Sequence, residues 1–140
     1  MAQSFSTDVE VRTTPDEAFA AITRPHVWWN PEIEGRSETA GDEFGFDMPG
    51  LHQTRLRVTE AIPGRRMVWH VLENHFSFVE DQEEWVGTDI VFDVASNAEG
   101  GVTITLTHVG LVPELECHNV CSGAWTDLVG TSLRNMLTSA

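Results

Sequence analysis

The 140-residue sequence contains no lysine, and its eight basic residues are all arginines. Against 22 acidic residues they leave a formal net charge of −14. Binding to nucleic acid or to anionic membranes needs clustered cations, because release of counterions from phosphates drives it. The densest basic patches here are the pairs Arg55/Arg57 and Arg65/Arg66. The composition therefore argues against nucleic-acid and anionic-membrane partners, and the acidity favours solubility.

Long apolar runs are also missing, since no stretch approaches the roughly 18 residues that a membrane helix requires. We expect no membrane insertion. The N-terminus, Met1 to Ser4, has neither the basic start nor the apolar segment of a signal peptide, so we expect a cytoplasmic protein. Internal repeats and linkers are absent from the sequence, and its length suits one core, so residues 1–140 are expected to form one domain.

Cysteine is scarce, with only Cys117 and Cys121 present. In a helix these two residues and His118 share a face, where zinc would bind if His108 or Glu114 completed a tetrahedron. No CxxC pair supports such a site, and two helical residues four apart have poor geometry for a disulfide. We predict two thiols, no metal and no other cofactor.

Established catalytic motifs are missing as well. The sequence has neither a G-x-S-x-G nucleophile elbow nor a glycine-rich phosphate loop. His70 and His75 superficially resemble a zinc-protease signature, but that chemistry needs two histidines on one helical face. The segment 70–75 has the pattern of a strand, which places the two rings on opposite sides.

Apolar periodicity predicts the secondary structure. Thr14, Pro15 and Glu17 form the sequence of a capping box, after which a short helix ends before Pro25 and residues 26–29 add another turn. The strand at 67–72 is apolar on both faces. The pattern leaves open whether the face with Trp69 and Val71 or the face with Val68 and Leu72 points inward. Alternating residues predict strands at 5–11, 44–48, 52–58, 67–72, 90–94 and 102–108.

After Pro113 the apolar period becomes that of a helix, which we predict to run to about Leu137. Gly123 and Gly130 interrupt it, and small residues near the inner stripe would let a ligand approach, so Gly123→Leu is expected to fill that space. The inner stripe consists of Leu115, His118, Cys121 or Ser122, Trp125, Leu128, Val129, Leu133 and Met136.

This order of elements predicts an α+β fold. A curved antiparallel sheet of about six to seven strands wraps around the long C-terminal helix, and two short helices follow the first strand. A curved sheet and a single helix do not fill the space between them completely. We therefore expect an internal apolar cavity on the concave side of the sheet.

Seven short motifs follow one another along almost the whole chain: Thr14–Phe19, Trp28-Trp29, Val58–Glu60 with Pro63-Gly64, Trp85–Thr88, Leu106–Leu111, Ala124-Trp125 and Ser132-Leu133. In this order they resemble the SRPBCC (START-like, helix-grip) superfamily. Within it the sequence is most similar to bacterial proteins related to the C-terminal domain of the heat-shock chaperone ATPase activator. The resemblance implies a deep cavity that accommodates a ligand.

The superfamily includes lipid carriers, hormone receptors, polyketide cyclases and co-chaperones, so the resemblance leaves the function open. The chaperone activator also carries an N-terminal domain that clamps the chaperone. We expect no such domain here, because nothing before Phe5 could supply it.

Two histidines are candidates for acid–base chemistry. His108 has the inward parity of its strand, and His118 lies on the inner stripe of the helix. With Glu73 or His75, if those also face inward, they could serve a cyclase, dehydratase or hydrolase reaction. The alternative is that each histidine only satisfies a backbone group at the mouth of the cavity.

The leading hypothesis is binding of a small apolar, lipid-like or aromatic molecule without covalent chemistry. The alternatives are the enzyme described above and a co-chaperone-like protein-interaction module, which would show an exposed apolar patch. Five tryptophans in so short a chain suit the wall of a ligand cavity. The expected ligand-binding residues are Trp69, Phe92, Ile104, Leu106, His108, His118, Trp125 and Val129.

We predict that the protein does not bind DNA or RNA at physiological salt, because it has no basic face and a large negative charge. Fluorescence anisotropy with labelled duplex and single strands checks this. Micromolar binding that weakens as salt is added would contradict it.

Overall fold

The computed structural model describes residues 5–48, 52–76, 85–98, 100–111 and 118–138. Within these ranges, seven strands form one antiparallel sheet in the order β1-β7-β6-β5-β4-β3-β2. The elements are β1 (Phe5–Val11), α1 (Pro15–Ile22), α2 (Pro25–Trp28), β2 (Glu34–Gly35), β3 (Glu43–Met48), β4 (His52–Ile62), β5 (Arg66–Phe76), β6 (Asp89–Ser96), β7 (Val102–Val109), α3 (His118–Asp127), the π-helical segment η1 (Leu128–Leu133) and α4 (Arg134–Thr138).

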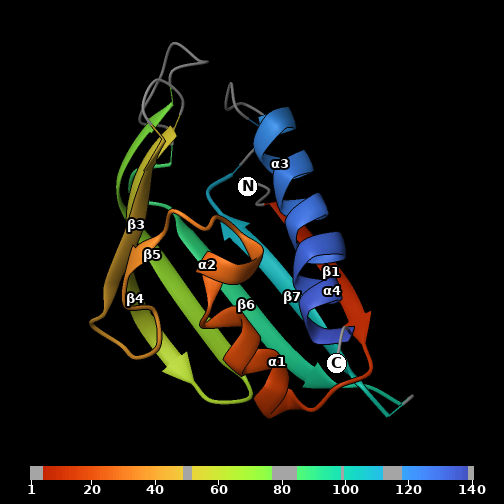
Figure 1. Cartoon of the computed structure of the whole chain (residues 1–140). Helices are drawn as coiled ribbons and strands as arrows, with labels where there is room; N and C mark the ends of the chain where they lie inside the picture. Colours follow the sequence, from red (N-terminus) through yellow and green to blue (C-terminus); the bar gives the residue numbers. More distant parts are fainter. Residues whose placement is uncertain (1–4, 49–51, 77–84, 99, 112–117, 139–140) are drawn as a thin grey trace.

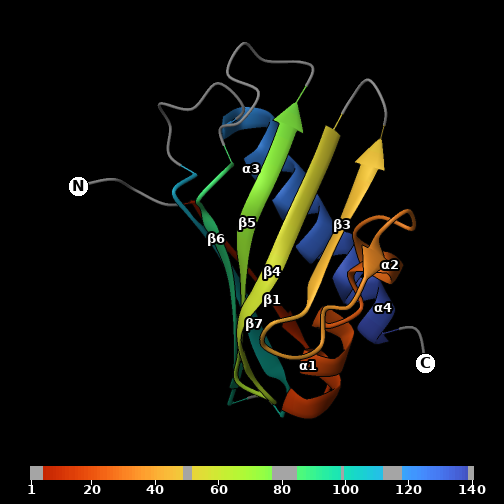
Figure 2. The ribbon, with the colours of Figure 1, turned by 90° about the vertical axis from the view of Figure 1, so that its left-hand side faces the viewer.

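The sheet is curved, and all the helices lie on one side of it (Figures 1 and 2). The rod formed by α3, η1 and α4 crosses the sheet diagonally, while α1 and α2 cover its lower half beside that rod (Figure 1). The predicted fold class and element order are confirmed. The two-residue edge strand β2 is an addition, because two residues are too few to give an alternating pattern.

The strands β4 and β5 are bent by two irregularities, between Arg55 and Leu56 and between Val58 and Glu60. Such bulges insert an extra residue and change which side chains face inward. Trp69 and Val71 are both fully buried on the helix side, which settles the inward face of this strand. At the first irregularity Leu56 pairs with Val71 and Arg55 with Glu73, so Leu72 is the extra residue.

Along the C-terminal rod, the buried residues recur at every fourth position. In an α-helix four residues advance by about 400°, so such a stripe drifts by about 40° at each step. The wider turn of η1 takes up this drift and keeps Val129 and Leu133 against the sheet. The predicted helix is therefore interrupted by a π segment. Its buried stripe is Cys121, Trp125, Val129 and Leu133, with Leu128 and Met136 half-buried.

The expectation for Gly123 is wrong. Gly123 is exposed, and a Cβ placed on it would meet no atom of a neighbouring described residue within 4 Å. Gly123 lies midway between the buried residues Cys121 and Trp125, on the solvent side of the helix. A leucine there would not reach the interior, so Gly123→Leu is no test of a cavity.

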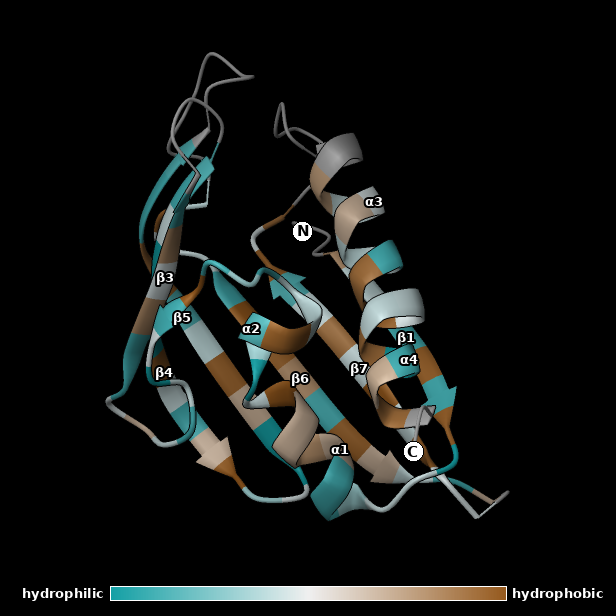
Figure 3. Ribbon diagram, viewed as in Figure 1, coloured by the Kyte–Doolittle hydropathy of each residue, from teal (hydrophilic) through white to brown (hydrophobic). Residues whose placement is uncertain are grey.

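Hydrophobic residues recur along the central strands β5, β6 and β7 and on the helices that face them (Figure 3). The core joins α1, α2 and the C-terminal rod to the concave face of the sheet. No helix in the described part of the chain is long and apolar enough to cross a membrane.

The helix α1 begins at the predicted cap. The Glu17 backbone N–H donates to Thr14 Oγ1 at 3.1 Å, and Pro15 occupies the first helical position. The carboxylate of Glu17 accepts from the Thr13 hydroxyl at 2.7 Å, rather than from the backbone of Thr14 as in a complete capping box. The threonine cap is thus confirmed, but the Glu17 carboxylate bonds to the side chain of Thr13 instead of the backbone of Thr14.

Thr14→Ala should lower the free energy of unfolding by about 1 kcal/mol, because the first turn of α1 loses its side-chain acceptor. Urea unfolding followed by circular dichroism measures this. Thr13→Ala is the matched control and should cost less, since it removes only an exposed bond between side chains. An unchanged midpoint for Thr14→Ala would show that the cap does not stabilise the helix.

Candidate functional site

Five tryptophans from four separate parts of the chain meet between the sheet and the C-terminal rod. We call them the tryptophan cluster: Trp28 in α2, Trp29 directly after it, Trp69 in β5, Trp85 before β6 and Trp125 in α3. Trp29 lies at the centre, with ring centroids 5.0 Å from Trp125, 5.9 Å from Trp69 and 6.4 Å from Trp85. The five rings therefore form a continuous aromatic wall, which includes two of the predicted ligand-binding residues, Trp69 and Trp125.

Phenylalanine edges complete this wall. Phe44 and Phe92 approach the Trp69 ring edge-on, with centroids at 4.9 Å and 4.7 Å. Phe46 approaches Trp29 in the same way at 5.3 Å. Edge-to-face contacts of this kind are the favoured geometry of aromatic pairs, so the rings hold one another in defined positions.

His108 lies fully buried behind the cluster, and both of its ring nitrogens are bonded. The Thr88 hydroxyl donates its proton to the Trp85 carbonyl at 2.6 Å, so towards His108 it accepts from Nε2–H at 2.8 Å. The indole N–H of Trp125 donates to Nδ1 at 3.0 Å. Burial lowers the pKa of His108 to about 3, because the charged ring would lose its hydration.

This arrangement fixes His108 as a neutral imidazole that links α3 to the sheet. A general base needs a lone pair that can reach a substrate proton. Here the Nδ1 lone pair already accepts the Trp125 indole N–H. Nε2 is protonated and donates a hydrogen bond to the Thr88 hydroxyl. The contacts give His108 a structural role at this position.

His52 and Asn74 form a second polar pair that the sequence analysis did not select. His52 Nε2 lies 2.9 Å from Asn74 Oδ1, and the ring stands edge-on to Phe46 and Trp85 at 4.9 Å and 5.3 Å. Burial lowers the pKa of His52 to about 4, and the bond to Asn74 opposes that change. In the sequence, His52 shares the alternation of Leu56, which could have identified it as inward-facing. The inward direction of Asn74 could not be inferred in this way, because it depends on the bulge at Leu72.

The same bulge removes two of the predicted acid–base candidates. Because Leu72 is an extra residue, Glu73 and His75 point outward and are exposed, while Asn74 between them is buried. They lie on the opposite face of the sheet from His108 and form no group with it. The side chain of His118, at the start of α3, lies outside the described residues.

The remaining predicted ligand-binding residues do lie inside. Trp125 is 1% exposed and the others are completely buried: Trp69, Phe92, Ile104, Leu106 and Val129. Ile104 and Leu106 lie in β7, and Leu106 pairs with Phe92 of β6. Ile104, Leu106 and Val129 belong to the same hydrophobic core as the tryptophan cluster.

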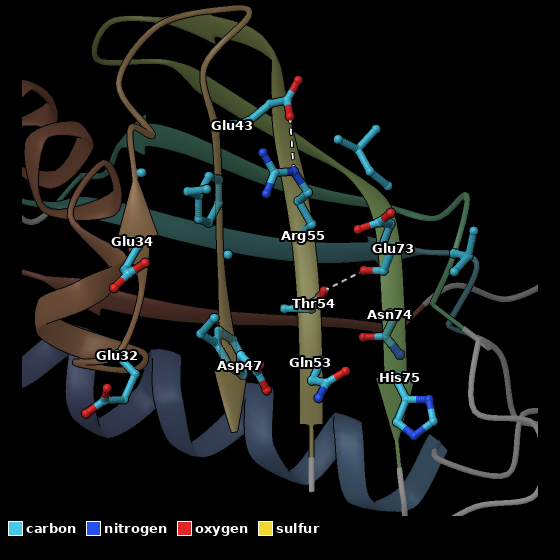
Figure 4. A pocket seen from close by; sticks show the side chains of 16 residues that line it. Glu32, Glu34, Glu43, Asp47, Gln53, Thr54, Arg55, Glu73, Asn74 and His75 are labelled. Carbon is cyan, nitrogen blue, oxygen red and sulfur yellow. Dashed lines mark hydrogen bonds and ion pairs between the residues drawn. The ribbon is translucent and has the colours of Figure 1, made fainter. Parts of the chain in front are cut away.

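A hollow of about 1060 Å³ lies on the outer face of β3, β4 and β5. Figure 4 shows its exposed side chains, among them Arg55, Glu73 and His75, on the side of the strands away from α3. Glu43 binds Arg55 and Arg57 there, which hold the pKa of its carboxyl below the usual range. This polar hollow differs from the expected internal apolar cavity. Its labelled lining residues are Glu32, Glu34, Glu43, Asp47, Gln53, Thr54, Arg55, Glu73, Asn74 and His75.

The predicted absence of metal concerned residues that are only partly described. Cys117 lies outside the described residues, and Cys121 is buried on the inner stripe of α3. Among the described histidines, cysteines and acidic residues, no group of three is placed to hold a metal ion.

No protein-family model and no curated protein matches this sequence. Solved structures do resemble it. The Aha1 dimer from Colwellia psychrerythraea has a TM-score of 0.78 at 21% identity, over 98% of this chain and 97% of that one. MLL2253 from Mesorhizobium loti has a TM-score of 0.77 at 11% identity, over 96% of each chain.

DynU16, a protein of the dynemicin biosynthetic locus, has a TM-score of 0.68 at 19% identity, over 96% of this chain and 47% of DynU16. At such low identities the likeness concerns the fold. The chain therefore has the helix-grip fold that its motifs and the order of its elements predict.

The two buried histidines predict how stability depends on pH. Their pKa values fall from 6.5 to about 4 for His52 and about 3 for His108 on folding. Above about pH 6.5 both histidines are neutral in the folded and the unfolded chain, and their contribution to the free energy of unfolding is complete. Below that pH the unfolded chain binds protons that the folded protein does not. From about pH 6.5 to about pH 5 the free energy of unfolding should fall, by up to about 1.4 kcal/mol per pH unit for each histidine.

Urea unfolding across this range measures the slope. His52→Phe keeps a ring beside Phe46 and removes one of the two groups, so the histidine part of the slope should fall by about half. His26→Phe, at an exposed position, is the matched control and should leave the slope unchanged. An equal slope in the wild type and in His52→Phe would contradict the burial of the neutral ring.

Proposed function

We propose that this protein binds a small, neutral, largely aromatic molecule between the sheet and the C-terminal helix. The observation that carries the proposal is the tryptophan cluster, in which five large rings from four separate parts of the chain gather on the concave face. Ligand sites use aromatic walls with a few polar groups that orient the ligand. The His52–Asn74 pair beside Phe46 and Trp85 supplies such polar groups.

The charge of the protein limits the ligand. A net charge of −14 repels anions, so a neutral molecule suits this interior better than a fatty-acid-like carboxylate. The rings favour a flat ligand, because stacked and edge-on contacts need planar surfaces.

Covalent chemistry is less well supported. His108 has both nitrogens committed within the protein, and Glu73 and His75 face away from the interior. Of the predicted acid–base candidates this leaves His118, at the start of α3. The observation in favour of an enzymatic function is the fold shared with DynU16, which belongs to a biosynthetic locus.

A co-chaperone-like function has the Aha1 likeness in its favour. Such a module needs a contiguous exposed apolar surface. Among the described residues, the large exposed apolar side chains are scattered over separate elements: Val27 in α2, Ile62 at the end of β4, Val86 before β6 and Val109 at the end of β7. This scatter favours ligand binding over docking.

Titration with N-phenyl-1-naphthylamine tests the proposal. We expect saturable binding of one probe per chain to the folded protein, with loss of tryptophan emission. Phe46→Ala should weaken binding by about fivefold to tenfold, the equivalent of about one lost aromatic pair. Val109→Ala, an exposed apolar position on β7, is the control and should bind as the wild type does. Binding that needs partial unfolding, or that ignores Phe46→Ala, would contradict the proposal.

A further inference from the structure

Trp29 differs from the other four members of the tryptophan cluster. It is half-buried, while Trp28, Trp69, Trp85 and Trp125 are at most 4% exposed. It nevertheless contacts more rings of the cluster than any of them, since its ring lies within 6.5 Å of those four and of Phe46. A ring at the centre of the wall thus also reaches the surface.

The backbone that carries Trp29 is a single short helical turn. The four-residue helix α2 has no side-chain cap at Arg24, and Trp29 itself is the residue that ends it. Pro31 follows closely, so the helix does not continue. The Trp29 N–H bonds to the Pro25 carbonyl at 2.7 Å, which anchors its backbone within this one turn.

The indole of Trp29 is also held less firmly than its neighbours. The Trp28 indole donates to the Ala21 carbonyl at 3.1 Å, and that of Trp125 donates to His108. Among the described residues no hydrogen bond holds the Trp29 indole, so packing alone keeps it in place. Moving it breaks ring contacts and leaves no bonded partner behind.

Directly beneath Trp29 lies the indole of Trp69. Trp69 is fully buried, and within the described part of the chain its Nε1–H has no hydrogen-bond partner. A buried donor without an acceptor destabilises the folded protein, and such groups are rare in native proteins. The ring of Trp29 stacks on Trp69 with an interplanar angle of only 6° and a centroid distance of 5.9 Å, and it offers that N–H no acceptor.

We propose that Trp29 occupies the place of the ligand and is displaced when the ligand binds. The ligand is then a flat, neutral aromatic molecule of about indole size or slightly larger, stacked on Trp69 and carrying an oxygen that accepts from Trp69 Nε1–H. This inference rests on the proposed function and adds to it the ligand class, the competing ring and the donor that recognises the ligand. It makes Trp29 and Trp69 the residues that determine affinity and specificity.

A matched pair of ligands tests both parts: 2-acetylnaphthalene, which has a carbonyl, and 2-ethylnaphthalene, which has the same shape without it. Displacement of N-phenyl-1-naphthylamine gives their affinities. Trp29→Ala removes the competing ring, so both affinities should rise by about tenfold, as expected when the open form is populated about one part in ten. Trp69→Phe should lower the affinity for the ketone by about fivefold and leave that for the hydrocarbon unchanged.

Trp28→Phe is the control, because it alters a neighbouring buried ring that is not in the proposed place of the ligand; it should raise neither affinity. Trp29→Phe keeps a smaller ring and should give an intermediate gain, which preserves the test if Trp29→Ala does not fold. If the wild type binds the probe and neither Trp29 variant binds the naphthalenes more tightly, the displacement inference fails alone. If neither the wild type nor the Trp29 variants bind, both the inference and the proposed function fail.

Discussion

The hydrogen bond from Trp125 to His108 is the contact on which the rest of the interior depends. It joins α3 to β7, and the bond from His108 to Thr88 extends the link to the turn before β6. All three groups are buried or half-buried, so breaking one bond would leave an unsatisfied donor or acceptor in the core. The link therefore sets how far the helix stands from the sheet, and with it the depth of the space that the other tryptophans fill.

Within that fixed space the cluster has two kinds of ring. Trp28 and Trp125 are tied by their indole N–H groups to the frame, through Ala21 and His108. Among the described residues, packing alone holds Trp29, and the indole N–H of Trp69 beneath it has no acceptor. A rigid frame around one movable ring gives a preorganised site, because binding then requires rearrangement of one side chain rather than of the fold.

The sequence predicts the frame well and the site only in part. The alternation in β6 and β7 placed Phe92, Ile104 and Leu106 inside, and the cap at Thr14 followed from local chemistry alone. Local irregularities of the backbone could not be predicted from the sequence pattern. The bulge at Leu72 exchanged Glu73 and His75 for Asn74 on the inner face, because one extra residue inverts every later side chain. The π segment likewise changed the helical phase, and Trp29 came from a short turn with no periodicity from which to infer its direction.

The indole N–H signals of the ¹⁵N-labelled protein test the account most directly. The signal of Trp69 is identified by its loss in Trp69→Phe, and that of Trp125 by its loss in Trp125→Phe. On addition of 2-acetylnaphthalene we predict that the Trp69 signal moves downfield as its proton gains an acceptor, while the Trp125 signal stays in place because its bond to His108 is kept. With 2-ethylnaphthalene the downfield shift should be absent. A Trp69 signal that ignores the ketone, or a larger change at Trp125 than at Trp69, would contradict the account.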